Sequence, residues 1–218
     1  MSLSIIIPAL NEATTLPATL KALPPHAEVI VVDGGSTDDT PRLAQRLGAR
    51  VIPSRPGRAR QMNAGAAAAR GQCLLFLHAD TLLPDRAAEL VTTALQRHHW
   101  GRFDVILQGR QPMLAVIGRL MNLRSRLSGI ATGDQGLFMR KSTFSAVGGF
   151  PEQPLMEDIE LSKRLKKQGP PACLRQRVRT SGRRWEQNGL WRTIWLMWRL
   201  RFAYWRGADP EQLAAQYR

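Results

Sequence analysis

The chain has 218 residues, a formal net charge of +14 at pH 7, 44% hydrophobic residues, 6% aromatic residues and two cysteines. This length fits one domain with a C-terminal appendage. The spacing of the two cysteines indicates neither a zinc site nor a disulfide framework, and because there is no run of 18 apolar residues, no transmembrane helix is predicted. The positive charge implies an anionic partner, which can be nucleic acid, a phosphate-bearing ligand or a membrane surface.

In the first half of the chain, short apolar runs alternate with helical patterns. Strands are predicted at residues 4–8, 28–33, 50–52 and 73–77, and helices at 13–23, 38–47 and 61–70, with a further helix beginning at Pro84. The runs are rich in β-branched or apolar residues, which is typical of buried parallel strands. This alternation predicts an α/β domain with a mostly parallel, Rossmann-like sheet flanked by helices.

The second half of the chain is less regular. Strands are predicted at 103–107, 136–140 and 174–180, and helices at 111–127, 156–168 and 185–205. The helix at 111–127 carries an apolar stripe made by Met113, Ile117, Leu120, Met121 and Leu127. Five of the six tryptophans lie at or beyond Trp185. We therefore divide the chain into a domain at 1–184 and a helical, basic, tryptophan-rich extension at 185–218.

Four segments of unusual composition adjoin the predicted strands, at 8–12, 33–37, 57–61 and 78–81. In an open α/β sheet, ligands bind outside the carboxyl ends of the strands, so these segments are expected at one edge. Asp33 can accept hydrogen bonds from a nucleobase or a ribose. Arg58 and Arg60 can contact phosphate oxygens, and Asp80 can hold a divalent cation that bridges a diphosphate.

Each of these residues also has a structural interpretation. Asp33 can belong to a plain loop in which Ser36 or Thr37 caps the next helix. Arg58 and Arg60 can form a solvated basic face, and Asp80 can cap the helix that follows it. The convergence of all the segments on one edge of the sheet favours the functional interpretation.

The order and spacing of these motifs resemble the family 2 inverting glycosyltransferases with the GT-A fold. The resemblance covers residues 2–185 and rests on segments 4–12, 31–38, 57–65, 76–80 and 156–161, with a degenerate match at 183–185. Segment 76–80 stands where the family carries its Asp-x-Asp motif, and segment 156–161 is similar to its Glu-Asp motif. The match is closest to the small bacterial group described as "transferase 2, radical-SAM/selenodomain-associated".

The resemblance implies a nucleotide-sugar donor, with UDP as the default nucleotide, and Mn²⁺ or Mg²⁺ as cofactor. The implied donor-binding residues are Pro8, Asn11, Glu12, Asp33, Gly35, Ser36, Arg58, Arg60, Asn63, Ala79 and Asp80. The implied metal ligands are Asp80 and His78, which replaces the first aspartate of Asp-x-Asp. Imidazole can bind Mn²⁺, whereas Mg²⁺ prefers oxygen. His78 can alternatively hydrogen-bond the ribose or diphosphate, or be a satisfied strand-end histidine.

Inverting transfer is a single displacement at the anomeric carbon and needs a base for the acceptor hydroxyl. Asp158 is the predicted base, with Glu157 beside it, because adjacent carboxylates disfavour each other's ionisation. The alternative is that both residues only complement the dipole of their helix. Contacts to the sugar and acceptor are expected from Asp134, Gln135, Arg183, Arg184 and Trp185. An exposed turn and a basic surface patch are the alternatives for these five residues.

The C-terminal helix is predicted to be amphipathic. Apolar residues recur at helical spacing, namely Trp191, Ile194, Trp195, Trp198, Phe202 and Trp205. Arg192, Arg199 and Arg206 recur seven residues apart on another face. The helix can pack on the domain, lie in an anionic membrane interface, which would suit a lipid-linked acceptor, or form a homodimer contact.

Three other functions are alternatives to glycosyl transfer. A nucleotidyltransferase would carry a glycine-rich, lysine-bearing loop after the first strand, and segment 9–13 has neither residue. A basic nucleic-acid-binding module agrees with the charge, but no such motif is visible and no nucleic acid is expected as partner. His78 also suggests a catalytically inactive relative. Without a signal-peptide pattern the predicted location is cytoplasmic, with peripheral attachment to the inner face of the membrane as the alternative.

Overall fold

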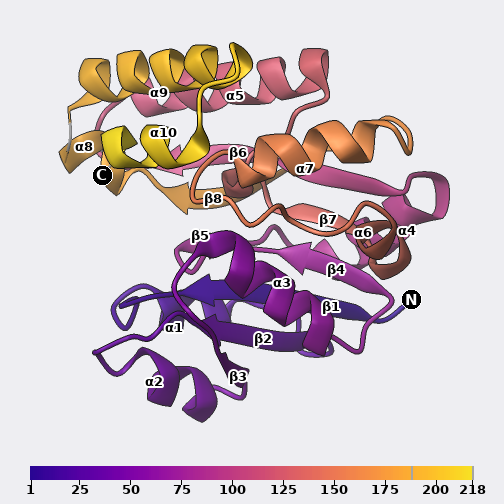
Figure 1. Cartoon of the computed structure of the whole chain (residues 1–218). Helices are drawn as coiled ribbons and strands as arrows, with labels where there is room; N and C mark the ends of the chain where they lie inside the picture. Colours follow the sequence, from indigo (N-terminus) through magenta and orange to yellow (C-terminus); the bar gives the residue numbers. More distant parts are fainter. Residues whose placement is uncertain (188, 218) are drawn as a thin grey trace.

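The computed structural model describes residues 1–187 and 189–217, and in this part of the chain it contains a sheet of eight strands (Figure 1). The strand order is β3-β2-β1-β4-β7-β6-β8-β5. The strands are β1 (Leu3–Ala9), β2 (Glu28–Asp33), β3 (Arg50–Pro53), β4 (Cys73–Phe76), β5 (Thr81–Leu82), β6 (Trp100–Gln108), β7 (Leu137–Arg140) and β8 (Ala172–Ser181). Only β7 and β5 of this sheet run against the others, so the prediction of a mostly parallel sheet is confirmed.

Helices cover both faces of the sheet. They are α1 (Leu16–Lys21), α2 (Thr40–Arg46), α3 (Arg58–Ala68), α4 (Ala87–Arg97), α5 (Met113–Ser128), α6 (Lys141–Ala146), α7 (Glu157–Lys166), α8 (Arg183–Gln187), α9 (Leu190–Trp205) and α10 (Pro210–Tyr217). A short 3-10 turn spans Gly133–Gln135. One core lies under α1, α2, α4 and α5, and the other lies under α3, α6 and α7.

The central strand β1 shows how the sequence builds these two cores. Successive side chains of a strand point to opposite faces. Ile5 and Ile7 therefore enter the core under α1, and Ile6 enters the core under α3. Helix α3 approaches the strand closely at Gly65, where a Cβ atom would lie 2.4 Å from Ile6 Cγ2. Glycine is needed at this point of the helix because no side chain fits there.

Several element boundaries differ from the predictions. Helix α3 begins at Arg58, directly after Gly57, so Arg58 and Arg60 lie in its first turn rather than in a loop. In place of the predicted helix at 185–205 the structure has two helices, α8 and α9, and Gly189, whose φ is +80°, directly precedes α9. The proposed domain boundary between residues 184 and 185 consequently falls inside α8. The short elements β5, α6 and α10 were not anticipated, because each carries too few residues for a clear periodic signal.

The apolar stripe predicted on α5 is only partly buried. Ile117 packs into the core, but Leu120 and Leu127 are 59% and 79% exposed. The buried face also contains Gly118, where an added Cβ would lie 3.3 Å from the carbonyl oxygen of Val105 in β6. The close approach of the helix to β6 at Gly118 thus buries the side that also carries Leu114 and Ile117, and turns Leu120 and Leu127 outward.

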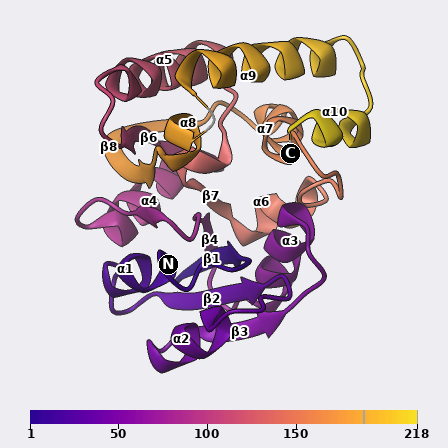
Figure 2. The ribbon, with the colours of Figure 1, turned by 90° about the vertical axis from the view of Figure 1, so that its left-hand side faces the viewer.

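The C-terminal helices α9 and α10 pack on the start of α7. A third apolar cluster joins Met156 to Leu200 of α9 and Leu213 of α10. Helices α5 and α9 lie at the same end of the molecule, opposite α2 (Figures 1 and 2). Within residues 1–187 and 189–217, no helix is long and apolar enough to span a bilayer.

Candidate active site

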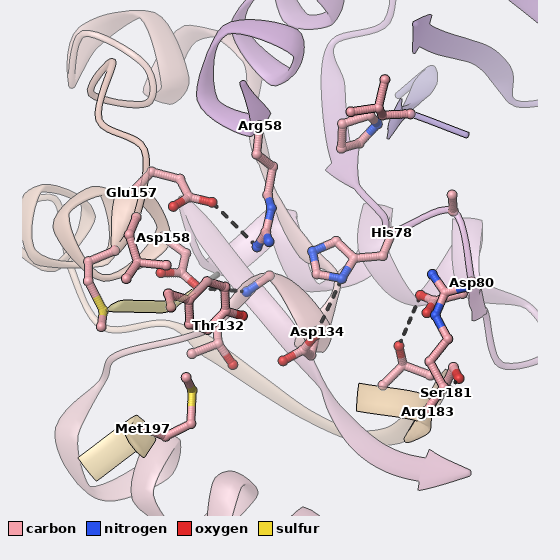
Figure 3. A pocket seen from close by; sticks show the side chains of 18 of the residues that line it. Arg58, His78, Asp80, Thr132, Asp134, Glu157, Asp158, Ser181, Arg183 and Met197 are labelled. Carbon is pink, nitrogen blue, oxygen red and sulfur yellow. Dashed lines mark hydrogen bonds and ion pairs between the residues drawn. The ribbon is translucent and has the colours of Figure 1, made fainter. Parts of the chain in front are cut away.

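A cleft of about 770 Å³ opens at the carboxyl edge of the sheet. It is lined from the ends of β1, β4 and β8, and from the starts of α3 and α7. Most of the predicted site residues line it, namely Pro8, Glu12, Arg58, His78, Ala79, Asp80, Asp134, Glu157, Asp158, Arg183 and Trp185. Figure 3 shows Glu157 and Asp158 on one side of this cleft, Asp80 and Arg183 on the other, and His78 between them.

An ion pair joins α3 to α7 at one side of the cleft. Nη1 of Arg58 lies 3.5 Å from Oε1 of Glu157, whose side chain is only 4% exposed. Burial raises the pKa of Glu157; Arg58 opposes this shift, whereas the charge of Asp158 adds to it. The guanidinium of Arg58 is only partly withdrawn from water, which alone would lower its pKa, but the surrounding carboxylates, Glu157 foremost, hold that pKa above its usual range. The pair therefore keeps a cation beside two acids inside the cleft.

Asp158 is held in a fixed orientation at the start of α7. Its Oδ2 accepts a hydrogen bond from the N–H of Gly133 at 2.9 Å, and its Oδ1 accepts one from the N–H of Ile159 at 2.7 Å. The chain enters α7 through Met156, which has a φ of +64°. A left-handed backbone is costly for a bulky residue and persists where packing enforces it. Its packing against Leu200 makes α9 part of the support for this turn.

His78 pairs with Asp134 in the middle of the cleft. Nδ1 of His78 lies 3.3 Å from Oδ1 of Asp134. Burial raises the pKa of Asp134, but the hydrogen bond and charge of His78, together with Arg58 and Arg124, lower it overall. Nε2 of His78 is buried without a hydrogen-bond partner in the described residues and lies against Gly133. A Cβ atom at Gly133 would lie 2.6 Å from this nitrogen, so only glycine admits the ring here.

Asp80 lies beside Arg183, on the side of the cleft away from Glu157 and Asp158 (Figure 3). Its Oδ1 accepts long hydrogen bonds from the hydroxyls of Thr180, at 3.4 Å, and Thr81, at 3.5 Å. The described residues contain no group of three or more His, Cys, Asp or Glu side chains arranged for a metal ion. One carboxylate still fits Mg²⁺ or Mn²⁺ chemistry when a bound diphosphate and water complete the oxygen shell. Asp80 is therefore the side chain that suits this role.

A second ion pair crosses the cleft between distant parts of the chain. Nη2 of Arg183 in α8 donates to Oε1 of Glu12 at 2.9 Å and to Oε2 at 3.2 Å. Glu12 follows β1, so the pair ties the segment after β1 to the start of α8. Trp185 packs partly buried against the core beside it. The side chain of Arg184 lies outside the described part of the chain.

Four of the predicted donor residues build the turns beside the cleft without lining it. The carboxylate of Asp33 accepts hydrogen bonds from the N–H groups of Gly35 and Ser36, both at 3.1 Å, and from the Ser36 hydroxyl at 2.5 Å. The backbone N–H of Asn11 donates to the Ser36 hydroxyl at 2.9 Å. Asp33 is paired in register with Ala9, which does line the cleft. This turn therefore supports one wall of the cleft.

Three further predicted residues lie away from the cleft lining. Arg60 forms an exposed ion pair with Glu152 at 3.2 Å. The side-chain amide of Asn63 accepts from the N–H of Phe150 at 2.9 Å and donates to its carbonyl at 2.8 Å. Gln135 is fully buried. None of these three side chains lines the cleft, although Oε1 of Gln135 accepts a hydrogen bond at 3.2 Å from the N–H of Thr132, which does line it.

Several cleft residues were missed from the sequence. Gln61 is buried, and its Nε2 donates to the carbonyls of Ala9 at 2.9 Å and Val32 at 2.8 Å, which holds the ends of β1 and β2. Helix α9 also contributes Thr193, Met197 and Arg201 to the lining. These three residues recur at intervals of four, which was a usable signal, but the tryptophans of the same helix dominated its pattern.

Known proteins share this sequence pattern and this fold. The family model described as "Glycosyl transferase family 2" matches residues 4–145. An uncharacterized glycosyltransferase of Mycobacterium tuberculosis is 36% identical over 103 residues, which cover 42% of this chain and 47% of the relative. The chain therefore spans about half the length of the curated relatives that it matches first.

Solved structures with glycosyltransferase folds superimpose on most of the chain. Staphylococcus aureus TarS in complex with UDP-GlcNAc has a TM-score of 0.62 at 17% identity and covers 83% of this chain and 58% of its own. The mannosyltransferase PcManGT of Pyrobaculum calidifontis, in complex with GDP-Man and Mn²⁺, has a TM-score of 0.67 at 18% identity and covers 99% of this chain and 68% of its own. The likeness confirms the predicted GT-A type fold.

Proposed function

Because the chain belongs to glycosyl transferase family 2, whose model matches well over half of it, we propose that it transfers a sugar from a nucleotide-sugar donor to an acceptor hydroxyl. The observation that carries this proposal is the convergence of Arg58, Asp80 and Asp158 on one cleft at the carboxyl edge of the sheet. These residues come from three different parts of the chain. They supply a cation, a carboxylate that can bind a metal ion, and a candidate base. Membership of the radical-SAM-associated group remains a prediction.

In the proposed reaction, the nucleotide of the donor binds at the wall of the cleft formed by β1 and β2. The nucleoside lies against the ends of these strands, near Pro8 and the Asp33 turn, with UDP as the default nucleotide. TarS and PcManGT, which share the fold, were solved with UDP-GlcNAc and GDP-Man. The diphosphate then extends toward Arg58 and Arg183, whose guanidinium groups can hydrogen-bond phosphate oxygens. Arg183 would exchange its bond to Glu12 for one to the diphosphate.

Asp80 is the proposed ligand of a divalent metal ion. A divalent metal held by Asp80 and the diphosphate oxygens would supply the positive charge that stabilises the leaving group. His78, the other predicted ligand, is engaged with Asp134 through Nδ1. We therefore expect His78 to orient Asp134 toward the sugar hydroxyls, and to join the metal only if that bond opens.

The base in the proposed reaction is Asp158. Its carboxylate is fixed by the N–H groups of Gly133 and Ile159, and a fixed orientation is what proton abstraction requires. As the acceptor oxygen attacks the anomeric carbon, its proton passes to Asp158 and the nucleoside diphosphate leaves from the opposite face. Attack from the opposite face inverts the anomeric configuration. Glu157 remains paired with Arg58 and sets the charge around the base.

The proposed acceptor site is formed by α8 and α9. Trp185, Met197 and Arg201 line the cleft on this side and offer an apolar surface with one cation. Such a lining suits an acceptor that is amphiphilic, and a lipid-linked acceptor remains our expectation. We also keep residues 185–218 as a C-terminal unit that completes the cleft.

The proposal is tested first by ligand binding. Thermal unfolding is followed with UDP, GDP and their sugar conjugates, with and without Mn²⁺ or Mg²⁺, because ligands that bind the folded state raise Tm by mass action. We expect a nucleoside diphosphate to raise Tm, and the metal to increase that rise. The replacement Asp80→Asn should abolish the additional rise in Tm caused by the metal, and should leave the rise caused by the nucleoside diphosphate alone unchanged. Stabilisation by nucleoside triphosphates, without any by nucleotide sugars, would instead indicate a nucleotidyltransferase.

The base is tested with Asp158→Asn, using release of nucleoside diphosphate from the donor with water as acceptor. We expect a loss of about 10²- to 10⁴-fold in rate with nucleotide affinity retained, since general base catalysis contributes that range. Asp85→Asn is the matched control, because Asp85 is exposed outside the cleft lining. Near-parental turnover by Asp158→Asn would remove Asp158 from the base role.

A further inference from the structure

Helices α5 and α9 carry nearly all of the large hydrophobic side chains that the described residues expose. Apart from Met1, Leu10 and Leu47, these side chains are Met113, Val116, Leu120, Leu123 and Leu127 of α5, and Trp191, Trp195, Trp198, Phe202 and Trp205 of α9. We call this set of ten side chains the apolar platform. Monomeric soluble proteins rarely expose apolar residues in such a concentrated set, so the platform requires an explanation.

The apolar platform lies at one end of the molecule and faces away from its body. Both views show α5 and α9 at the end opposite α2 (Figures 1 and 2). The inner face of α5 is buried through Leu114 and Ile117, and the inner face of α9 is buried through Leu200. Residues spaced three and four apart share one side of a helix, so the exposed members form one outward stripe on each helix.

The charged side chains that α5 and α9 themselves carry are all positive. Neither α5 nor α9 contains an aspartate or a glutamate. Exposed arginines border the stripes, namely Arg119, Arg192, Arg199 and Arg206, whereas Arg126 of α5 turns to β6 and pairs with Asp104 at 2.7 Å. The guanidinium carbon of Arg199 lies 4.9 Å from the ring centre of Trp195, and that of Arg206 lies 6.0 Å from the ring centre of Phe202. The cations thus stand at the level of the aromatic rings.

We propose that the apolar platform lies in the interface of an anionic phospholipid bilayer. Tryptophan rings favour the headgroup level, leucines enter the acyl region beneath it, and each arginine near an anionic surface adds attraction. A second copy of the chain would be a poorer occupant, because a two-fold contact sets the same arginine-flanked surface against itself. The docking is peripheral, since α5 and α9 lie along the surface rather than across the bilayer.

The position of α9 relates this docking to the cleft. Its outer side carries the tryptophans, while Thr193, Met197 and Arg201 on its other sides line the cleft. An α-helix with its side chains is about 10–12 Å wide. The bilayer would therefore lie about one helix width from the cleft, within reach of an acceptor that remains embedded in lipid. This last consequence rests on the proposed glycosyl transfer, whereas the docking itself does not.

The docking is tested by sedimentation of the whole chain with vesicles of phosphatidylglycerol, and of phosphatidylcholine alone, without donor or metal. We expect binding to the anionic vesicles, weakening as salt is raised. Leu127→Gln on α5 and Trp198→Gln on α9 should each weaken it about tenfold, because each removes an apolar group from the bilayer. Leu47→Gln is the matched control, since Leu47 is an exposed leucine beside α2 at the opposite end of the molecule.

Four results would overturn the proposal. The first is that the chain does not bind anionic vesicles, and the second is that it binds neutral vesicles equally well. The third is that Leu47→Gln weakens vesicle binding as much as Leu127→Gln and Trp198→Gln do. The fourth is that the chain binds no vesicles but forms a concentration-dependent dimer, which Trp198→Gln dissociates. Because donor is absent from the assay, failed docking is distinguishable from failed glycosyl transfer, which the nucleotide titrations measure separately. Circular dichroism of each variant confirms that the helices are retained.

Discussion

The ion pair between Arg58 and Glu157 makes a strong prediction about stability. Replacement Arg58→Met keeps an aliphatic stem of similar length but leaves the buried Glu157 carboxylate without its cation. At the observed 3.5 Å, and with an effective dielectric constant of about 20, the attraction is about 5 kcal/mol. The Arg58 side chain is 42% exposed, so solvent screening reduces the effect, and we expect a loss of about 2 kcal/mol at pH 8.

The stability lost in Arg58→Met should increase as pH rises. The pKa of Glu157 is raised in the folded protein by burial, so the folded state binds this proton more tightly than the unfolded chain. The stabilisation from that proton is complete below the unfolded pKa, near 4.5, and disappears as pH rises through the folded pKa. Removing Arg58 raises the pKa of Glu157 in the folded protein further. The free energy of unfolding of the variant should therefore differ little from that of the parent at pH 5 and most at pH 8.

Urea unfolding at pH 5 and pH 8 measures this difference. Arg60→Met is the matched control, because Arg60 lies in the same helix turn and pairs with Glu152 at 3.2 Å, but with side chains 51% and 63% exposed. We expect its loss to stay below about 1 kcal/mol despite the shorter distance. The double variant Arg58→Met with Glu157→Gln should recover most of the stability. Equal losses for Arg58→Met at both pH values, or a loss no larger than that of Arg60→Met, would refute the reasoning.

The remaining predictions concern three other contacts around the cleft. Asn63→Ala should cost about 1–3 kcal/mol of unfolding free energy, because two buried backbone groups lose their partner, and should leave nucleotide affinity unchanged in calorimetric titration. Gly133→Ala should cost about 1–3 kcal/mol by overpacking against the ring of His78, measured by thermal unfolding. Glu12→Gln should change stability by less than about 1 kcal/mol but should tighten nucleoside diphosphate binding at low salt, because it releases Arg183 for the diphosphate.

Each of these outcomes has a contrary result. Weaker nucleotide binding by a fully stable Asn63→Ala would restore Asn63 to the donor site. If adding His78→Ala failed to rescue Gly133→Ala, the contact with the ring would not be the cause. Glu89→Gln removes an exposed carboxylate paired with Arg86 outside the cleft lining, and an equal gain in nucleotide affinity there would make the effect of Glu12→Gln one of net charge.

The sequence predicted the half of the fold in which local pattern is sufficient. Buried strands such as β1 and β2 are continuous apolar runs, and the polar residues that end them have to meet at one edge of a parallel sheet. This reasoning predicts Pro8, Arg58 and Asp80 at one edge of the sheet, and all three line the cleft there. It could not distinguish residues that line the cleft from those that build its support, as Asn63 shows.

Only the tertiary structure determined what depends on contacts between distant segments. The pairs of Arg58 with Glu157 and of Glu12 with Arg183 join residues about 100 and 171 positions apart, and no local pattern encodes them. The outward turn of Leu120 and Leu127 was likewise decided by the close packing of Gly118 on β6. A helix with apolar residues on two sides does not reveal which side is buried. That choice, made by packing, is what produced both the cleft wall and the apolar platform.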